Sequence, residues 1–382
     1  MAEATTDAFL SGQGFPVDPN QIEAELTRLW GPAAERAGGP ELESPNVTRI
    51  VLSNLVVEAG PKCPESLEAT LDTVAERHPS RAIVLKRTDQ PGRKVEAEIA
   101  ALCHLPSADR PQVCSERIIL RAGPDAVDLL PGAVRPLLEA NLPFVLWWTE
   151  DPRATESLFR DLAGECSRLI LDLPDPLAEP EAIRIGLDPS TNPFARDTAW
   201  FGITRWRELV AQFFDCRDPL AMLSKLASVE VSAIVPGEPR TPRIAAWLVA
   251  WLAGQLGWTP VDRLEAGPGR LEATFRSPAG EVKVAIHAAG SKDAGAAQIL
   301  GVNLATRGDD TYHLARPEPG SPRVRVNVSS PSACALPRIV LSPELLAPDR
   351  VTAALESARL DPPFARALPH ALWLLGAGPL PR

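Results

Sequence analysis

The sequence predicts an α/β N-terminal domain with a mixed or mostly parallel sheet, followed by an α+β domain with an antiparallel sheet. Between residues 47 and 173, apolar runs of strand length alternate with stretches of helical length, which favours a sheet covered on both faces. Between 271 and 330, short alternating runs are separated by Gly, Pro, Asp or Asn, which is typical of an antiparallel meander. A chain of 382 residues also exceeds one ordinary core. We therefore expect domains at 45–185 and 187–382 after an arm and linker at 1–44.

The N-terminal arm is predicted to contain a helix at 20–30. Apolar residues recur there at helical spacing after a candidate N-cap at Asp18 or Asn20. The Gly-, Pro- and Glu-rich stretch 31–45 predicts a linker. We expect this arm to pack on the body of the protein or on another chain.

The first domain alternates strands and helices. Strands are predicted at 48–59, 80–87, 143–148 and 168–173, and helices at 64–79, 125–141 and 154–166. Residues 94–105 and 112–122 alternate polar and apolar side chains, which predicts a pair of half-exposed antiparallel strands.

The second domain is predicted to begin after a Pro-rich border at 174–182. The later half of 198–216 favours a helix, followed by a strand at 228–235 and a strongly apolar helix at 243–257. After the meander, helices at 343–358 and 363–376 close the chain.

Composition and charge exclude several classes of partner. The net charge of −10 and the pI of about 5.2 argue against nucleic acid or an anionic membrane as the main partner. The longest apolar stretch, 245–258, is shorter than the roughly 20 residues needed to span a bilayer. The opening residues contain acids and no basic region, so a secretory signal is not indicated. We expect a cytoplasmic protein.

The six cysteines are scattered, and so are the five histidines. No C-x-x-C or other close pair with zinc-ligand spacing occurs, so we expect no metal. The pattern favours reduced thiols packed as small hydrophobic side chains.

Motifs for cofactor binding and nucleophilic catalysis are missing. The first strand–helix junction, 56–66, has one glycine and two prolines where a dinucleotide-binding G-x-G-x-x-G would lie. No P-loop motif and no G-x-S-x-G occur, and Cys103 and His104 would face opposite sides of a strand. We expect no cofactor.

Two acidic pairs are candidates for acid–base chemistry. Glu150/Asp151 and Asp172/Asp175 each follow an apolar strand, at the sheet edge where α/β enzymes keep their ligands. Acids and prolines also end strands and cap helices, which explains both pairs without catalysis.

Two arginines flank a tryptophan at a predicted helix start. Arg205 and Arg207 surround Trp206, and such a pair could bind phosphate. Glu208 lies beside Arg205 at i,i+3, so a surface ion pair accounts for it equally well.

Tryptophan is the unusual component of this chain. Seven of the nine tryptophans lie between 147 and 258, whereas tyrosine occurs once. Core packing explains Trp247 and Trp251, which are four residues apart on one predicted helix. Trp and Arg are also enriched at the centres of protein interfaces. The residues predicted to bind a partner are Trp200, Arg205, Trp206, Arg207 and Trp148. Trp147 and Trp148 are adjacent on a strand and must face opposite sides of the sheet, so they cannot form one stacking platform.

Several segments in this order resemble the glucose-6-phosphate dehydrogenase assembly protein family (OpcA). They are HPSRAIVL (78–85), CSERIIL (114–120), LPFVLWW (142–148), RLILD (168–172), RWRELVAQFFD (205–215) and AWLVAWLAGQLGW (246–258). The similarity runs from about 45 to 260 and weakens through the meander. Ala199 stands where the family pattern usually has a small polar residue. The resemblance implies a non-catalytic protein that binds glucose-6-phosphate dehydrogenase and promotes its active oligomer in the oxidative pentose phosphate pathway.

Two alternatives remain open at this point. The chain could be an enzyme acting on a sugar phosphate, with Arg205 and Arg207 binding phosphate and Asp172 and Asp175 acting as acid and base. It could also be a binding module for another metabolic enzyme. We do not extend to this chain the redox control through cysteines that has been considered for photosynthetic members of the family. The cysteines here are far apart in the sequence, and a disulfide requires two of them to have Cα atoms within about 7 Å.

Overall fold

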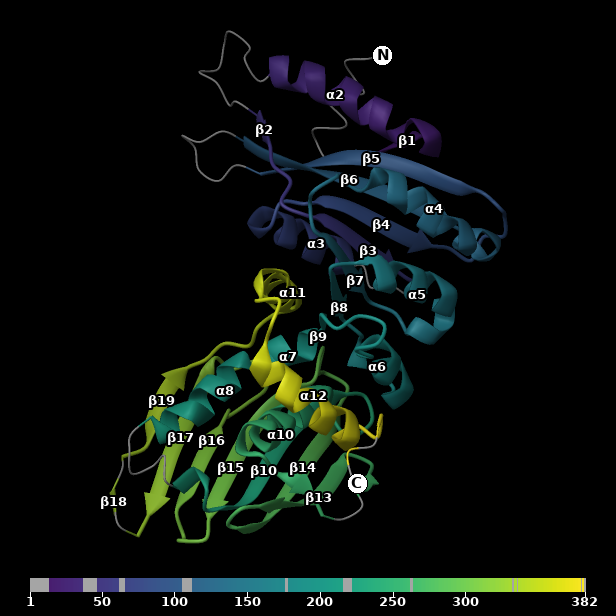
Figure 1. Ribbon diagram of the computed structural model, residues 1–382. Helices are drawn as coiled ribbons and strands as arrows, with labels where there is room; N and C mark the ends of the chain where they lie inside the picture. Colours follow the sequence, from purple (N-terminus) through teal and green to yellow (C-terminus); the bar gives the residue numbers. More distant parts are fainter. Residues whose placement is uncertain are drawn as a thin grey trace. The chain divides into compact units, whose positions relative to one another are not determined.

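A computed structural model of the protein describes residues 14–36, 47–61, 66–104, 112–175, 178–215, 222–261, 264–331, 333–334, 336–378 and 380. The chain forms two compact units, each with its own sheet (Figure 1). The first unit comprises Met1–Pro174, Gly186–Asp197 and Ala347–Arg359, and the second comprises Asp175–Ile185, Thr198–Leu346 and Leu360–Arg382. The units therefore differ from the predicted domains, because two later segments return to the first unit.

The sheet of the first unit is mostly parallel, as predicted. Its order is β1-β5-β6-β4-β3-β7-β8-β9, with β2 also pairing with β6. The strands are β1 (Phe15–Val17), β2 (Val47–Arg49), β3 (Asn54–Ala59), β4 (Arg81–Arg87), β5 (Val95–His104), β6 (Gln112–Ala122), β7 (Phe144–Trp148), β8 (Arg168–Leu171) and β9 (Ala195–Asp197). Taken in chain order, the parallel strands β3, β4, β6, β7, β8 and β9 have the arrangement 3-2-1-4-5-6. This is the order of doubly wound dinucleotide-binding sheets.

The structure corrects several predicted elements of this unit. The strand predicted at 48–59 is two strands, β2 and β3, and β9 was not predicted. The helix predicted at 125–141 is broken into η2 (Pro124–Leu129), α4 (Leu130–Val134) and η3 (Arg135–Leu137). Prolines lie in each of the three pieces, and a proline removes a helical hydrogen bond.

The helices of this unit come from three parts of the chain. α3 (Ser66–Arg77) and α5 (Glu156–Glu165) connect successive strands; η4 (Pro152–Thr155) precedes α5. α11 (Ala347–Glu356) packs against α3 and β8. Arg168 of β8 donates hydrogen bonds to the carbonyls of Ala354, Leu355 and Ser357, so it caps the C-terminal end of α11.

The N-terminal arm packs on the first unit. Its helix α2 (Ile22–Arg36) extends beyond the predicted end and buries Ile22, Leu26 and Leu29. Trp30 Nε1 donates to Glu116 Oε1 at 2.6 Å. Arg81 Nε contacts Glu116 Oε2 at 2.7 Å. Glu116 is fully buried, so α2 is held by a buried charge that two neighbouring arginines, Arg49 and Arg81, neutralise.

The second unit has a mostly antiparallel sheet, as predicted, with one parallel pair, β10 and β14. Its order is β11-β13-β14-β10-β15-β16-β17-β18, with β12 pairing with β13 and β19 with β17. The strands are β10 (Leu226–Pro236), β11 (Thr259–Pro260), β12 (Glu265–Gly267), β13 (Arg270–Ser277), β14 (Gly280–Ser291), β15 (Gln298–Thr306), β16 (Thr311–Ala315), β17 (Arg323–Ser330), β18 (Ala333–Cys334) and β19 (Arg338–Leu341). Burial alternates along β13, β14 and β16, so one face of the sheet meets the core.

Helices cover that buried face. They are α7 (Thr198–Gly202), α8 (Thr204–Ala211), α10 (Arg243–Leu256) and α12 (Pro362–Leu374), with η6 (Gln212–Phe214) after α8; a further helix, α6 (Pro180–Gly186), precedes them in the chain. Trp200 of α7, Trp247 of α10 and Phe364 of α12 meet with ring centroids 5.0 to 5.5 Å apart. Among the described residues no helix is both long and apolar enough to cross a bilayer.

Candidate functional site

The tryptophans of the predicted partner-binding segment lie in the core of the second unit. Trp200 is 1% exposed and Trp206 is 3% exposed. Trp200 Nε1 donates to Asp361 Oδ2 at 3.0 Å, which satisfies its polar group inside the unit. Both indoles therefore pack in the core beneath α7 and α8 and do not form the outer surface of this segment.

The two arginines of the same segment have different environments. Arg205 is exposed and pairs with Glu208 at 3.0 Å. The guanidinium of Arg207 stacks over the ring of Trp200, 3.9 Å from its centroid, and Nη2 donates to Thr204 Oγ1. Burial lowers the pKa of Arg207 to about 10, against the opposing effects of Asp361 and Glu208. The outer surface of α8 thus presents Arg205, Glu208 and part of Arg207.

Trp148 is 0% exposed, so its ring does not reach the surface of the first unit. It packs edge-on against Phe159 of α5, with ring centroids 5.0 Å apart. Its neighbour Trp147 donates through Nε1 to Asp172 Oδ2 at 3.2 Å. The two rings have different partners, as their adjacent positions on one strand require.

The acids and arginines considered for sugar-phosphate chemistry are not brought together within one unit. Asp172 belongs to the first unit, whereas Asp175, Arg205 and Arg207 belong to the second. Asp175 Oδ2 accepts a hydrogen bond from the backbone N–H of Ala297 at 3.1 Å. Asp151, from the other acidic pair, caps η4 by accepting from Arg153 N–H. These contacts match the structural explanation of both acidic pairs.

A buried ionic cluster lies where the strand order of the first sheet reverses, between β3 and β7. Glu58 of β3 is fully buried, and its Oε1 accepts from Arg87 Nε at 2.7 Å. Glu150, which follows β7, lies 3.6 Å from Arg87 Nη2. Burial raises the pKa of Glu58 to about 7, Arg87 opposes that shift, and Glu150 adds to it. Sequence reasoning missed Glu58, although an acid inside an apolar strand signals a buried charge.

This cluster occupies the place of a phosphate cradle. In sheets of this order the turn after the first strand approaches a pyrophosphate closely. Here the turn contains Gly60, and a Cβ built there would lie 2.2 Å from the carboxyl carbon of Glu150. The glycine therefore makes room for a carboxylate. Two acids share one arginine, and Glu58, with a pKa of about 7, is only partly ionised at neutral pH, so this position offers a phosphate no net positive charge.

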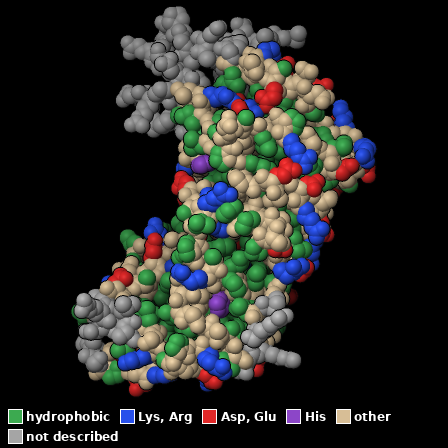
Figure 2. All heavy atoms as spheres, viewed as in Figure 1, with side chains coloured by type: hydrophobic (Ala, Val, Ile, Leu, Met, Phe, Trp, Pro, Cys, Tyr) green, Lys and Arg blue, Asp and Glu red, His purple; other side chains and the backbone are tan. Residues whose placement is uncertain are grey.

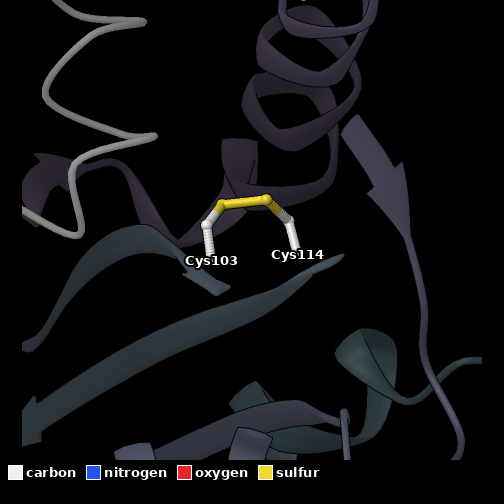
Figure 3. Close-up of a disulfide and its surroundings, with 2 residues drawn as sticks. All are labelled: Cys103 and Cys114. Carbon is white, nitrogen blue, oxygen red and sulfur yellow. A yellow bond between two sulfur atoms is a disulfide. The ribbon is translucent and has the colours of Figure 1, made fainter. Parts of the chain in front are cut away.

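Cys103 of β5 and Cys114 of β6 form a disulfide, with Cα atoms 4.1 Å apart (Figure 3). The two residues face each other directly across the antiparallel pair. The prediction of reduced thiols is wrong for these two, because strand register brings together cysteines 11 positions apart. Cys166 is free and buried. Predictions for Cys63 and Cys216 lie outside the described residues.

Charge is mixed on the surface. On the face seen in Figure 2, Lys and Arg side chains are interspersed with Asp and Glu side chains. Within the described ranges no group of three or more His, Cys, Asp or Glu is placed to hold a metal ion.

Two family models match the chain. Residues 71–184 match the glucose-6-phosphate dehydrogenase subunit N-terminal domain of OpcA. Residues 193–368 match the corresponding C-terminal domain. Together these two matches cover most of the chain.

Curated relatives agree with these matches. A protein of Synechococcus elongatus named OxPP cycle protein OpcA is 30% identical over 204 residues, covering 51% of this chain and 44% of that protein. A protein of Nostoc punctiforme with the same name is 30% identical over 195 residues, covering 50% of this chain and 41% of that protein. The chain thus matches less than half the length of these relatives.

Solved structures overlap more loosely. A 3-ketoreductase from Actinomadura kijaniata overlaps with a TM-score of 0.47 at 10% identity, covering 85% of this chain and 96% of that chain. A glucose-6-phosphate dehydrogenase bound to its substrate overlaps with a TM-score of 0.43 at 8% identity, covering 84% and 88%. Overlaps at this level carry no argument about function.

Proposed function

The chain belongs to the OpcA family of glucose-6-phosphate dehydrogenase subunits, and on that premise we propose that it is a non-catalytic protein that binds glucose-6-phosphate dehydrogenase and promotes its active oligomer. The observation that carries this proposal is the pair of family matches over both units. Activation requires only that the protein prefers the active state of the enzyme. A preference of about 5.5 kcal/mol would convert 1% active enzyme into 99%.

The carboxyl edge of the first sheet supports a non-catalytic role. Glu58 and Glu150 share Arg87 where a dinucleotide-binding sheet approaches pyrophosphate, so this position offers a phosphate no net positive charge. The acids suggested by the sequence for catalysis, Asp151 and Asp175, accept backbone hydrogen bonds. Both observations favour binding over chemistry.

The test is an assay of the cognate dehydrogenase with and without an excess of the purified protein. We expect a higher reaction rate at a given substrate concentration, and co-elution of the two proteins in size-exclusion chromatography. Unchanged kinetics together with separate elution would contradict the proposal. Affinity capture from lysate distinguishes this partner from another metabolic enzyme.

We propose the outer surface of α8 as part of the contact, with Arg205 and Arg207 touching the enzyme and the buried Trp200 and Trp206 holding the helix in place. An Arg205→Glu substitution should weaken binding about tenfold, because it reverses a charge at the contact. Arg160→Glu on α5 is the matched control, since Arg160 forms a similar exposed pair with Glu156. Equal effects of the two substitutions would place the contact elsewhere.

A further inference from the structure

A cavity of about 610 Å³ lies in the first unit. Its walls come from the segments that follow four strands of the sheet: β3, β4, β6 and β7. The lining residues are Pro61, Arg87, Thr88, Asp89, Pro124, Val127, Asp128, Ala154, Thr155, Glu156 and Ser157. The volume is in the range of small-molecule sites. The carboxyl ends of the strands beside the reversal of strand order are where doubly wound sheets hold their ligands.

Two polar groups of this cavity, on Thr155 and Asp89, have no hydrogen-bond partner among the described residues. The hydroxyl oxygen of Thr155 is buried and makes no hydrogen bond within the described part of the chain. Thr155 precedes the first turn of α5 but its side chain makes no capping bond. Asp89 is exposed, and neither a hydrogen bond nor an ion pair joins it to the described residues. A buried hydroxyl without a partner costs free energy, so a ligand that bonds to Thr155 would recover it.

The other walls determine the shape of ligand that fits. Pro61, Pro124, Val127 and Ala154 supply apolar surface suited to a flat ring. Asp89 lies two residues after β4, the second parallel strand in chain order. In sheets of this order an acid near the end of the second strand accepts hydrogen bonds from ribose hydroxyls. The cavity thus combines an apolar wall with an acceptor for a sugar.

The phosphate part of such a ligand would meet negative charge. Glu150 lies against Gly60, next to Pro61 of the cavity wall, and it shares Arg87 with the buried Glu58. Like charges at close range in a buried site repel strongly. Groups without phosphate avoid this repulsion.

We propose that this cavity binds an uncharged nucleoside, with ribose hydroxyls donating to Asp89 and with Thr155 supplying a further hydrogen bond. The carboxylate of Glu150 discriminates against nucleotides. This site is separate from the proposed dehydrogenase contact on α8, and it requires no dehydrogenase.

Calorimetric titration of the full chain with adenosine, AMP and NAD tests the proposal. We expect saturable binding of adenosine with a Kd below about 1 mM, and AMP and NAD at least about tenfold weaker. No saturable binding of adenosine, or binding of AMP as tight as that of adenosine, would overturn it. Because the dehydrogenase is absent, this outcome is independent of the test of the proposed function.

Substitutions locate the site. Asp89→Asn should weaken adenosine binding about tenfold, because an amide is a poorer acceptor than a carboxylate. Asp128→Asn is the matched control, since Asp128 lines the same cavity but pairs with Arg93.

Glu150→Gln should raise the affinity for AMP about tenfold relative to adenosine by removing one charge. Equal losses in the Asp89 and Asp128 variants, or an unchanged AMP preference in the Glu150 variant, would contradict the assignment.

Discussion

Glu58 combines complete burial with a single cationic partner, Arg87. Its Oε2 makes no hydrogen bond among the described residues. The charged form is therefore poorly compensated, and burial raises the pKa of Glu58 from its ordinary value of 4.5 to about 7. The folded protein binds this proton more tightly than the unfolded chain does.

This residue predicts a pH dependence of stability. The contribution of protonated Glu58 is fully present below pH 4.5 and is lost as pH rises through about 7. The shift corresponds to about 3 kcal/mol over that interval. Glu58→Gln should remove this decline, as measured by urea unfolding across the interval. Glu165→Gln is the control, because Arg135 lowers the pKa of that exposed acid. An identical pH profile in wild type and Glu58→Gln would refute the assignment.

At the residue scale, sequence patterns predicted which sides of the sheet adjacent side chains face, but they did not predict the buried ion pair. Adjacent positions on one strand required Trp147 and Trp148 to face opposite sides, and their different partners follow from that. The burial of Trp200 was not predictable, because its ring packs against Trp247 of α10 and Phe364 of α12, which come later in the chain. The same limit applies to Glu58, whose partner Arg87 lies on another strand.

Among the elements, α10 and α12 approach each other closely at a glycine. A Cβ at Gly254 would lie 2.5 Å from the carbonyl oxygen of Arg366. Gly254→Ala should therefore destabilise the second unit by about 1–3 kcal/mol despite the better helix propensity of alanine. Gly164→Ala on α5 is the matched control, since nothing lies within 4 Å of its Cβ. It should be neutral or stabilise by up to about 1 kcal/mol. The thermal unfolding temperature should fall in Gly254→Ala and stay the same or rise in Gly164→Ala, and an equal fall in both variants would be evidence against this close approach.

The disulfide that joins β5 and β6 leads to a prediction about stability. The Cys103–Cys114 disulfide closes a loop with a sequence separation of 11. Cys103→Ser should lower the free energy of unfolding by about 2–3 kcal/mol, because the unfolded chain gains conformational entropy. A reductant should reproduce the loss in wild type and have no further effect on the variant. A reductant effect of the same size in both proteins would argue against this bond.

Element types were more predictable than their ends. Alternation predicted β5 and β6 as an antiparallel pair, but the register that aligns Cys103 with Cys114 follows from pairing along the whole strand. Prolines ended the predicted helix at 125–141 in places that apolar spacing did not reveal. The strand β9 was missed because three residues carry too little pattern.

For the whole molecule, the sequence predicted two sheets of the right kinds but not how segments are shared between them. α11 and α12 are separated by a few residues, yet they belong to different units. Side-chain contacts decide this: Arg77 of α3 pairs with Asp349 of α11 at 2.5 Å, and Arg168 caps the same helix. Neither contact has a local sequence signature.

Hydrogen exchange tests this division. Val74 of α3 is fully buried, and Val74→Ala should destabilise the first unit by about 1–2 kcal/mol. Amide exchange should then accelerate in α11, at 347–356, more than in α12, at 362–374. The matched experiment is Gly254→Ala, which should accelerate α12 more than α11. If α11 follows α12 in both variants, the assignment of α11 to the first unit is wrong.

The return of 347–359 to the first unit has a consequence for synthesis. A ribosome delivers the chain from its N-terminus, so α3 and β8 emerge long before the helix that packs on them. The carbonyl groups that accept hydrogen bonds from Arg168 are translated nearly 190 residues later. The first unit is therefore completed only after residues 347–359 have been translated, and the nascent chain must remain unaggregated until then.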